Sequence, residues 1–274
     1  MKLYKKTAHW ADSGGENMKK ICIANNKGGV AKTTTSYNLA SYYARKGFKT
    51  LVVDMDPQGN LTDALGIDPN TLDFTIYDVL IKRDVSPYMI KLPQYDNFYL
   101  VPSNLESETA NISLASQVSR ESLLKKALKS VEDDFDICII DTSPSLSILT
   151  FNALTAADSI YITLKSGYFE LRGAGMLIGT INEVKENLNT ELKISGLILT
   201  QYDARTTLSS DSKEQLEQYF ESGILNTVVR QNVDLAKAPA LAQDIFTYNA
   251  TSNGAKDYEA LALEILDREG MKNE

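Results

Sequence analysis

The chain has 274 residues, 43% hydrophobic and 23% charged, an ordinary globular composition that excludes wholesale disorder. Its formal net charge of −8 excludes a protein that is basic throughout, although a local basic patch remains compatible with it. Two cysteines and one histidine are too few for a zinc site with four Cys or His ligands. No stretch approaches the roughly 18 apolar residues of a membrane span, and the N-terminus lacks the apolar core of a signal peptide. We therefore expect a cytoplasmic protein without membrane contact.

Residues 1–17 show neither strand nor helix periodicity, and the first regular element is expected at Met18. Two interpretations stay open: a disordered N-terminal extension, or a segment upstream of a true start at Met18. We favour the second, because Gly14-Gly15-Glu16 can be encoded by a sequence that resembles a bacterial ribosome-binding site. Residues 18–274 are expected to form one domain, since no linker or internal repeat interrupts them.

From Met18 onward, short apolar strands alternate with amphipathic helices. The predicted strands are 20–24, 50–53, 98–101, 137–140, 159–164, 192–199 and, as the last, 225–229. Helices are predicted over 32–46, 119–131 and 170–188. Two apolar stripes support the later helices: Leu123, Leu124, Ala127, Leu128 and Val131 in one, and Leu177, Ile181, Val184 and Leu188 in the other. The alternation predicts an α/β fold of the P-loop type, with a mostly parallel, twisted sheet covered by helices on both faces, and places Cys22 and Cys138 in core strands.

A glycine-rich segment stands between the first strand and the first helix. It consists of Lys27, Gly28, Gly29, Val30, Ala31, Lys32, Thr33 and Thr34. Such a turn at a helix N-terminus lets successive backbone N–H groups face a phosphate. Lys32 would reach the β- and γ-phosphates, and the Thr33 hydroxyl would ligate Mg²⁺. The strict pattern GxxxxGK(S/T) is not met, because Asn26 and Ala31 replace glycines; the deviant form KGGxxK(S/T), with the extra Lys27, is met.

Carboxylates follow two of the predicted strands. Asp56 comes just after the second strand, and Asp141 closes the fourth. Because the carboxyl ends of parallel strands meet at one edge of a sheet, both should lie beside the phosphate loop. Asp141 fits the acid that holds Mg²⁺ through water. The sequence therefore predicts a site for a nucleotide and a metal at this edge.

Three segments, KGGVAKTTT, VDMDPQGNLTDALG and DICIIDTSPSLSILTFNAL, resemble the ParA/Soj family of partition ATPases. This family belongs to the deviant Walker A class, which also contains MinD and nitrogenase iron protein. The similarity continues to Ala238-Pro239 and covers roughly residues 18 to 265. The DPQGN motif favours ParA over MinD, as does an acidic C-terminal stretch, 255–274, in place of a basic membrane anchor.

The resemblance implies an ATP hydrolase that is weak alone and is stimulated by a ParB-type, centromere-binding partner. ATP would join two monomers face to face in a homodimer, with Lys27 reaching the phosphates held by the other subunit. Asp56 would position the attacking water and would also join Thr33 and Asp141 around Mg²⁺. Asn232 would contact the nucleotide. In this state the protein would bind DNA without sequence preference and associate with the nucleoid.

Several residues depart from the family pattern. Ala31 replaces a glycine, and we expect its Cβ to require a negative φ or a slightly shifted loop. Arg205 matches a basic position of the family's DNA face, whereas Asp234 stands where arginine is usual. Arg230, Lys237 and Lys213 are possible substitutes.

Two alternative functions remain compatible with the sequence. One is a positioning ATPase for another cargo, and the other is a nucleotide-dependent binding or co-regulatory module with little hydrolysis.

Overall fold

The computed structural model describes residues 18–165, 170–203 and 223–271. A seven-stranded sheet runs through its centre in the order β3-β4-β2-β5-β1-β6-β7. The strands are β1 (Lys19–Ala24), β2 (Thr50–Met55), β3 (Ile90–Lys91), β4 (Phe98–Val101), β5 (Ile137–Thr142), β6 (Ser159–Lys165) and β7 (Lys193–Thr200). All pairs are parallel except β3 with β4, so the predicted mostly parallel sheet is confirmed.

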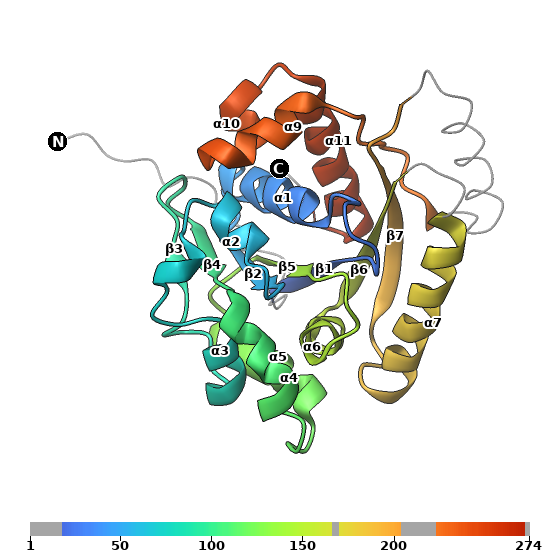
Figure 1. The fold of residues 1–274 in the computed structure, drawn as a ribbon. Helices are drawn as coiled ribbons and strands as arrows, with labels where there is room; N and C mark the ends of the chain where they lie inside the picture. The colour runs from blue at the N-terminus through green and yellow to red at the C-terminus, as the bar shows by residue number, and fades with distance from the viewer. Residues whose placement is uncertain (1–17, 166–169, 204–222, 272–274) are drawn as a thin grey trace.

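Helices cover both faces of the sheet (Figure 1). One face carries α1 (Lys32–Arg45), α2 (Asn60–Ala64), α9 (Val233–Lys237), α10 (Ile245–Asn249) and α11 (Asn253–Arg268). The other carries α3 (Ile76–Lys82), α4 (Ala110–Ser113), α5 (Leu123–Leu128), α6 (Ile148–Ala156) and α7 (Glu170–Asn187). Short 3-10 turns complete the described part: η1 (Pro69–Thr71), η2 (Leu105–Thr109), η3 (Arg120–Ser122), η4 (Lys129–Val131) and η6 (Ala238–Leu241).

Alternate residues of the central strands feed two separate hydrophobic cores. In β1, Ile21 and Ile23 pack on the α1 side, whereas Cys22 and Ala24 pack on the opposite side. Successive side chains of a strand point to opposite faces, so a strand that is apolar throughout must be covered twice. Both cysteines, Cys22 and Cys138, are fully buried in these strands, as predicted.

The structure corrects three sequence-based expectations. Residues 225–229 form no strand, because the N–H groups of Asn226 and Thr227 donate to the Glu264 carboxylate. Isolated bridges flank this segment, from Ile224 to Leu197 of β7 and from Arg230 to Tyr202. The helix predicted over 119–131 is regular only in α5, with a 3-10 turn at each end, although its five stripe residues are buried. Leu188 follows α7 and is 40% exposed, so it does not extend the buried stripe.

Among the described residues, no helix is both long and apolar enough to cross a bilayer.

Candidate nucleotide-binding site

The carboxyl ends of β1, β2 and β5 meet at one edge of the sheet. In the strand register, Asp141 of β5 lies opposite Ile23 of β1 and opposite Asp54 of β2. The glycine-rich loop leaves β1 at the same edge and enters α1 (Figure 1). The fold therefore brings the loop next to Asp141, as predicted, and next to the end of β2, which Asp56 follows.

Two residues of the loop adopt left-handed backbone conformations before α1 begins. Gly29 has φ 72°, and Ala31, the N-cap of α1, has φ 61° and ψ 30°. Left-handed residues within such a loop turn neighbouring N–H groups toward a common centre, which is an arrangement that binds anions. Of the two alternatives expected for Ala31, a negative φ or a slightly shifted loop, the negative φ is wrong. The chain enters the helix through a left-handed residue here, and the alanine adopts that conformation although glycine would do so without strain.

Lys32 lies buried at the start of α1, with 7% of the residue exposed. Its ammonium donates to the carbonyl of Lys27 at 2.8 Å and so joins the two ends of the loop. Burial lowers the pKa of Lys32, while the nearby carboxylates of Asp141 and Asp56 act in the opposite direction. A partly desolvated ammonium at the N-terminus of a helix provides strong attraction for a phosphate.

Asp141 receives hydrogen bonds from two hydroxyls of α1. Thr33 Oγ1 donates to Oδ2 at 2.8 Å, and Ser36 Oγ donates to Oδ1 at 2.7 Å. Burial raises the pKa of Asp141 to about 6, against the opposing effect of these hydrogen bonds and of Lys32. Hydroxyl and carboxylate oxygens are the ligands that Mg²⁺ prefers, and it takes few of them from the protein when phosphates supply others. The donor set therefore fits Mg²⁺. Ser36 was missed, because a serine inside a helix carries no distinctive sequence signal.

Asp54 is a second carboxylate that the sequence interpretation did not single out. It is fully buried in β2, and its oxygens accept from Asp56 N at 3.0 Å, from Thr62 N at 3.0 Å and from Thr62 Oγ1 at 2.8 Å. Burial, followed by the charge of Asp141, raises the pKa of Asp54 to about 7. Asp54 thus fixes the turn that carries Asp56, itself 6% exposed. A charged residue within an apolar strand was the signal that could have revealed it.

The turn after Asp56 depends on a glycine. Gly59 has φ 63°, and a Cβ there would lie 2.8 Å from the carbonyl oxygen of Ser103. This close approach explains the glycine of the DPQGN motif without any contact to a ligand.

The remaining predicted site residues lie on the segment that leads into α9, or beyond the described residues. Asn232 caps α9, where its side chain accepts from Asp234 N at 2.8 Å. Arg230 is engaged by Asp257, with an ion pair of 2.6 Å and a backbone hydrogen bond of 2.9 Å. Lys237 is exposed in the last turn of α9. Arg205 and Lys213 lie outside the described residues.

The negative charge of Asp234, which would repel DNA phosphates, is held in place by the neighbouring Asn249. Its side chain is half-buried, and Oδ2 accepts from Asn249 Nδ2 at 3.0 Å. The carboxylate therefore has a structural role in joining α9 to α10.

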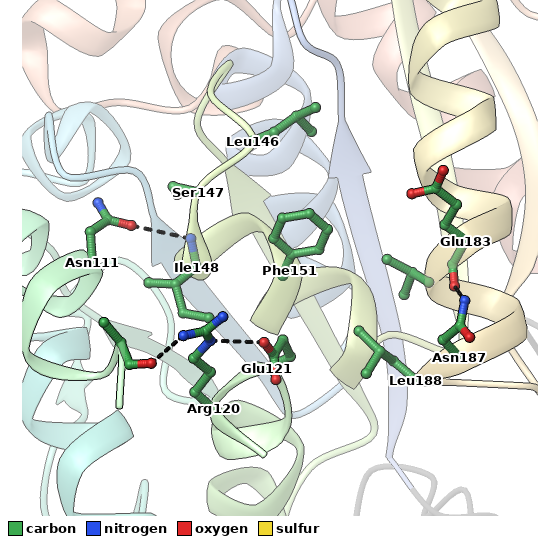
Figure 2. Close-up of a pocket in the computed structure, with 12 residues that line it drawn as sticks. Asn111, Arg120, Glu121, Leu146, Ser147, Ile148, Phe151, Glu183, Asn187 and Leu188 are labelled. Atoms are coloured by element: carbon green, nitrogen blue, oxygen red, sulfur yellow. Dashed lines mark hydrogen bonds and ion pairs between the residues drawn. The ribbon is translucent and has the colours of Figure 1, made fainter. Parts of the chain in front are cut away.

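A separate cavity of about 650 Å³ lies between α6 and α7, on the opposite face from α1 (Figure 2). Phe151 and Ile148 of α6 face it, and Arg120 is turned toward Glu121 at its rim. No residue of the glycine-rich loop lines this cavity. It is therefore distinct from the candidate nucleotide site.

The sheet order, together with a glycine-rich loop after the interior strand β1 and carboxylates at the neighbouring strand ends, defines a P-loop nucleotide-binding protein. The family model of an AAA domain matches residues 18–194. The chromosome-partitioning ATPase Soj of Treponema pallidum is 39% identical over 254 residues, which cover 93% of this chain and 99% of that protein. The chromosome partitioning protein ParA of Myxococcus xanthus is 38% identical over 264 residues, which cover 96% of this chain and 92% of that protein. The chain belongs to the ParA/Soj family of partition ATPases.

Solved structures share the same fold. Cobyrinic acid a,c-diamide synthase from Mycobacterium smegmatis, with bound ADP and magnesium, superposes with a TM-score of 0.81 at 33% identity, covering 92% of this chain and 96% of that one. McdA of Cyanothece superposes with a TM-score of 0.84 at 22% identity, covering 94% of this chain and 98% of that one. The second likeness is one of fold alone.

Proposed function

We propose that this protein is a DNA-partition ATPase that binds and hydrolyses ATP at the loop of residues 27–34. The observation that carries the proposal is that the buried Lys32 ammonium, the Thr33 hydroxyl and the Asp141 carboxylate converge where the carboxyl ends of β1 and β5 meet. Membership of the ParA/Soj family supports ATP hydrolysis, and the magnesium and ADP bound by the cobyrinic acid a,c-diamide synthase structure support the same pair of ligands here.

Each side chain of the site has a distinct task in this proposal. Lys32 offsets the charge of the β- and γ-phosphates, while Thr33 and Asp141 hold Mg²⁺, with Asp56 close by. The metal, when bound, supplies further compensation for the negative charge of the phosphates. Asp56 orients the water that attacks the terminal phosphate, from a turn that Asp54 fixes.

We further propose that ATP joins two copies of the chain, with Lys27 of each copy reaching the nucleotide held by the other. The backbone of Lys27 is anchored at both ends of its residue, because its N–H donates to Asn25 Oδ1 at 2.9 Å and its carbonyl accepts from Lys32. Loop residues Gly28 and Gly29 beside it are exposed, which leaves this edge open to a second molecule. A second cation would add to the charge compensation on the phosphates.

The dimer is proposed to bind DNA without sequence preference and to act in the cytoplasm, on the nucleoid, with a ParB-type partner. The names of the Soj and ParA relatives support a role in chromosome partition. Of the two candidate contacts in the described part of the chain, Arg230 and Lys237, Lys237 is the better placed, because it is exposed. Arg230 contributes less, since Asp257 already compensates its charge. Non-specific binding through phosphates needs several such contacts on each molecule.

Titration calorimetry with MgATP tests the central proposal. Lys32→Ala should weaken binding by about a hundredfold or more, because phosphates in a partly buried site would lose their cation. Lys46→Ala is the matched control: Lys46 follows the other end of α1, its side chain is 38% exposed, and its loss should leave binding unchanged. Equal affinities for Lys32→Ala and wild type would refute the phosphate-loop assignment.

A further inference from the structure

The outer side of the glycine-rich loop is held by the end of β7. Gln201 Nε2 donates to the carbonyl of Gly29 at 2.7 Å, and Thr200 Oγ1 donates to the carbonyl of Val30 at 3.1 Å. The Thr200 hydroxyl also lies 3.2 Å from the carbonyl of Leu164, so it shares its one proton between two acceptors. Gln201 therefore makes the stronger of the two contacts, and it bridges 172 positions of sequence.

The direction of these carbonyls determines where the loop's N–H groups point. In a planar trans peptide, the C=O of one residue and the N–H of the next point in opposite directions. The unit that contains the Gly29 carbonyl also contains the Val30 N–H, and the unit of the Val30 carbonyl contains the Ala31 N–H. Holding both carbonyls toward β7 thus turns both N–H groups to the other side of the loop.

Gln201 is itself held in one unusual conformation. Its φ is 51°, a left-handed conformation that a residue other than glycine adopts only with strain. The following residue is fixed by two backbone hydrogen bonds, from Tyr202 N to Val229 O at 3.0 Å and from Gln231 N to Tyr202 O at 3.1 Å. These contacts fix the backbone beside Gln201 in the absence of a ligand, and the side chain is held by its own bond to the Gly29 carbonyl. The position is therefore preorganised.

We propose that Gln201 is a positioning residue of the phosphate loop, with Thr200 as its auxiliary. Its amide fixes the Gly29 carbonyl outward, so that the Val30 N–H is aimed at phosphate before nucleotide arrives. Because preorganised donors need no rearrangement on binding, the loss of this contact weakens the affinity for any ligand that carries the cradled phosphate. This inference rests on the proposed phosphate loop.

The test uses the whole chain with Gln201→Ala, measured by titration calorimetry against MgATP and MgADP. We expect both dissociation constants to rise by the same factor, roughly two- to tenfold, the worth of one hydrogen bond. Amide hydrogen exchange of a peptide that spans the loop should become faster in the nucleotide-free variant. Gln94→Ala is the matched control, because Gln94 Nε2 also donates to a backbone carbonyl, that of Leu65 at 3.1 Å, in another part of the molecule. It should leave affinity and loop exchange unchanged.

Two outcomes would overturn the inference. One is wild-type affinity in Gln201→Ala, whatever its loop exchange; the other is an equal loss of affinity in Gln94→Ala, which would indicate general destabilisation. Lys32→Ala in the same series separates this inference from the proposed function. If Lys32→Ala loses binding while Gln201→Ala does not, the positioning role of Gln201 is wrong, whereas the phosphate-loop assignment is supported. If neither variant loses binding, the phosphate loop is wrong as well.

Discussion

Replacing Ala31 with glycine should stabilise the nucleotide-free protein. Ala31 holds φ 61° and ψ 30°, a left-handed conformation that costs an L-residue about 1–2 kcal/mol. Glycine has no such penalty, but its greater freedom in the unfolded chain costs about 0.5–1 kcal/mol. The difference leaves a net gain of about 0.5–1 kcal/mol in the free energy of unfolding. For a chain of this size, the melting temperature should rise by about 1–4 °C.

Two neighbouring glycines provide matched controls for this prediction. Gly29 has φ 72°, and no atom lies within 4 Å of a Cβ built on it, so Gly29→Ala adds backbone strain without a clash and should lower the melting temperature. The same open space surrounds Gly28, which has no positive φ, so Gly28→Ala should be neutral or slightly stabilising. Differential scanning calorimetry without nucleotide measures all three variants. A lower melting temperature in Ala31→Gly, or an unchanged one in Gly29→Ala, would refute the strain argument.

The stability of the nucleotide-free protein should decrease from about pH 5 to about pH 8. Burial raises the pKa of Asp54 to about 7 and that of Asp141 to about 6, so the native state keeps protons that the unfolded chain releases near pH 4, and the free energy of unfolding falls as pH rises. Urea unfolding at the two pH values measures this, and a higher midpoint at the upper pH would contradict it. Asp234→Arg should tighten ATP-dependent binding to two unrelated duplexes in a polarisation titration and steepen its salt dependence; a variant that binds no tighter than wild type would show that DNA sits elsewhere. Arg230→Ala should lower the melting temperature, because it leaves Asp257 without its cation, whereas Lys237→Ala should weaken DNA binding at an unchanged melting temperature.

The fold could be predicted largely from the sequence because the central strands are apolar on both faces. β4 matches its predicted bounds, and β1 begins one residue earlier than predicted. Residues 225–229 misled the prediction, since their β-branched pattern resembles a strand while the Glu264 carboxylate, on α11, competes for the N–H groups. A contact across 37 or 38 residues leaves no local trace in the sequence.

The site was predictable where one residue type at a fixed spacing determines the chemistry. Lys32, Thr33 and Asp141 follow from the loop pattern and the strand ends, and the structure places them together. The support around them was not predictable, because Gln201 reaches the loop from a position far along the chain. The left-handed Ala31 was also missed, since a sequence reports the presence of a Cβ but not the backbone angle that it must accept.

Sedimentation velocity with and without MgATP tests the central claim, an ATP-driven dimer, most directly. The variant to measure is Asp56→Ala, which should bind nucleotide but hydrolyse it poorly, with Lys32→Ala alongside as the variant unable to bind. We expect MgATP to double the sedimenting mass of Asp56→Ala and of wild type, more persistently in the variant, and to leave that of Lys32→Ala unchanged. Monomers of both Asp56→Ala and wild type at saturating MgATP would contradict it.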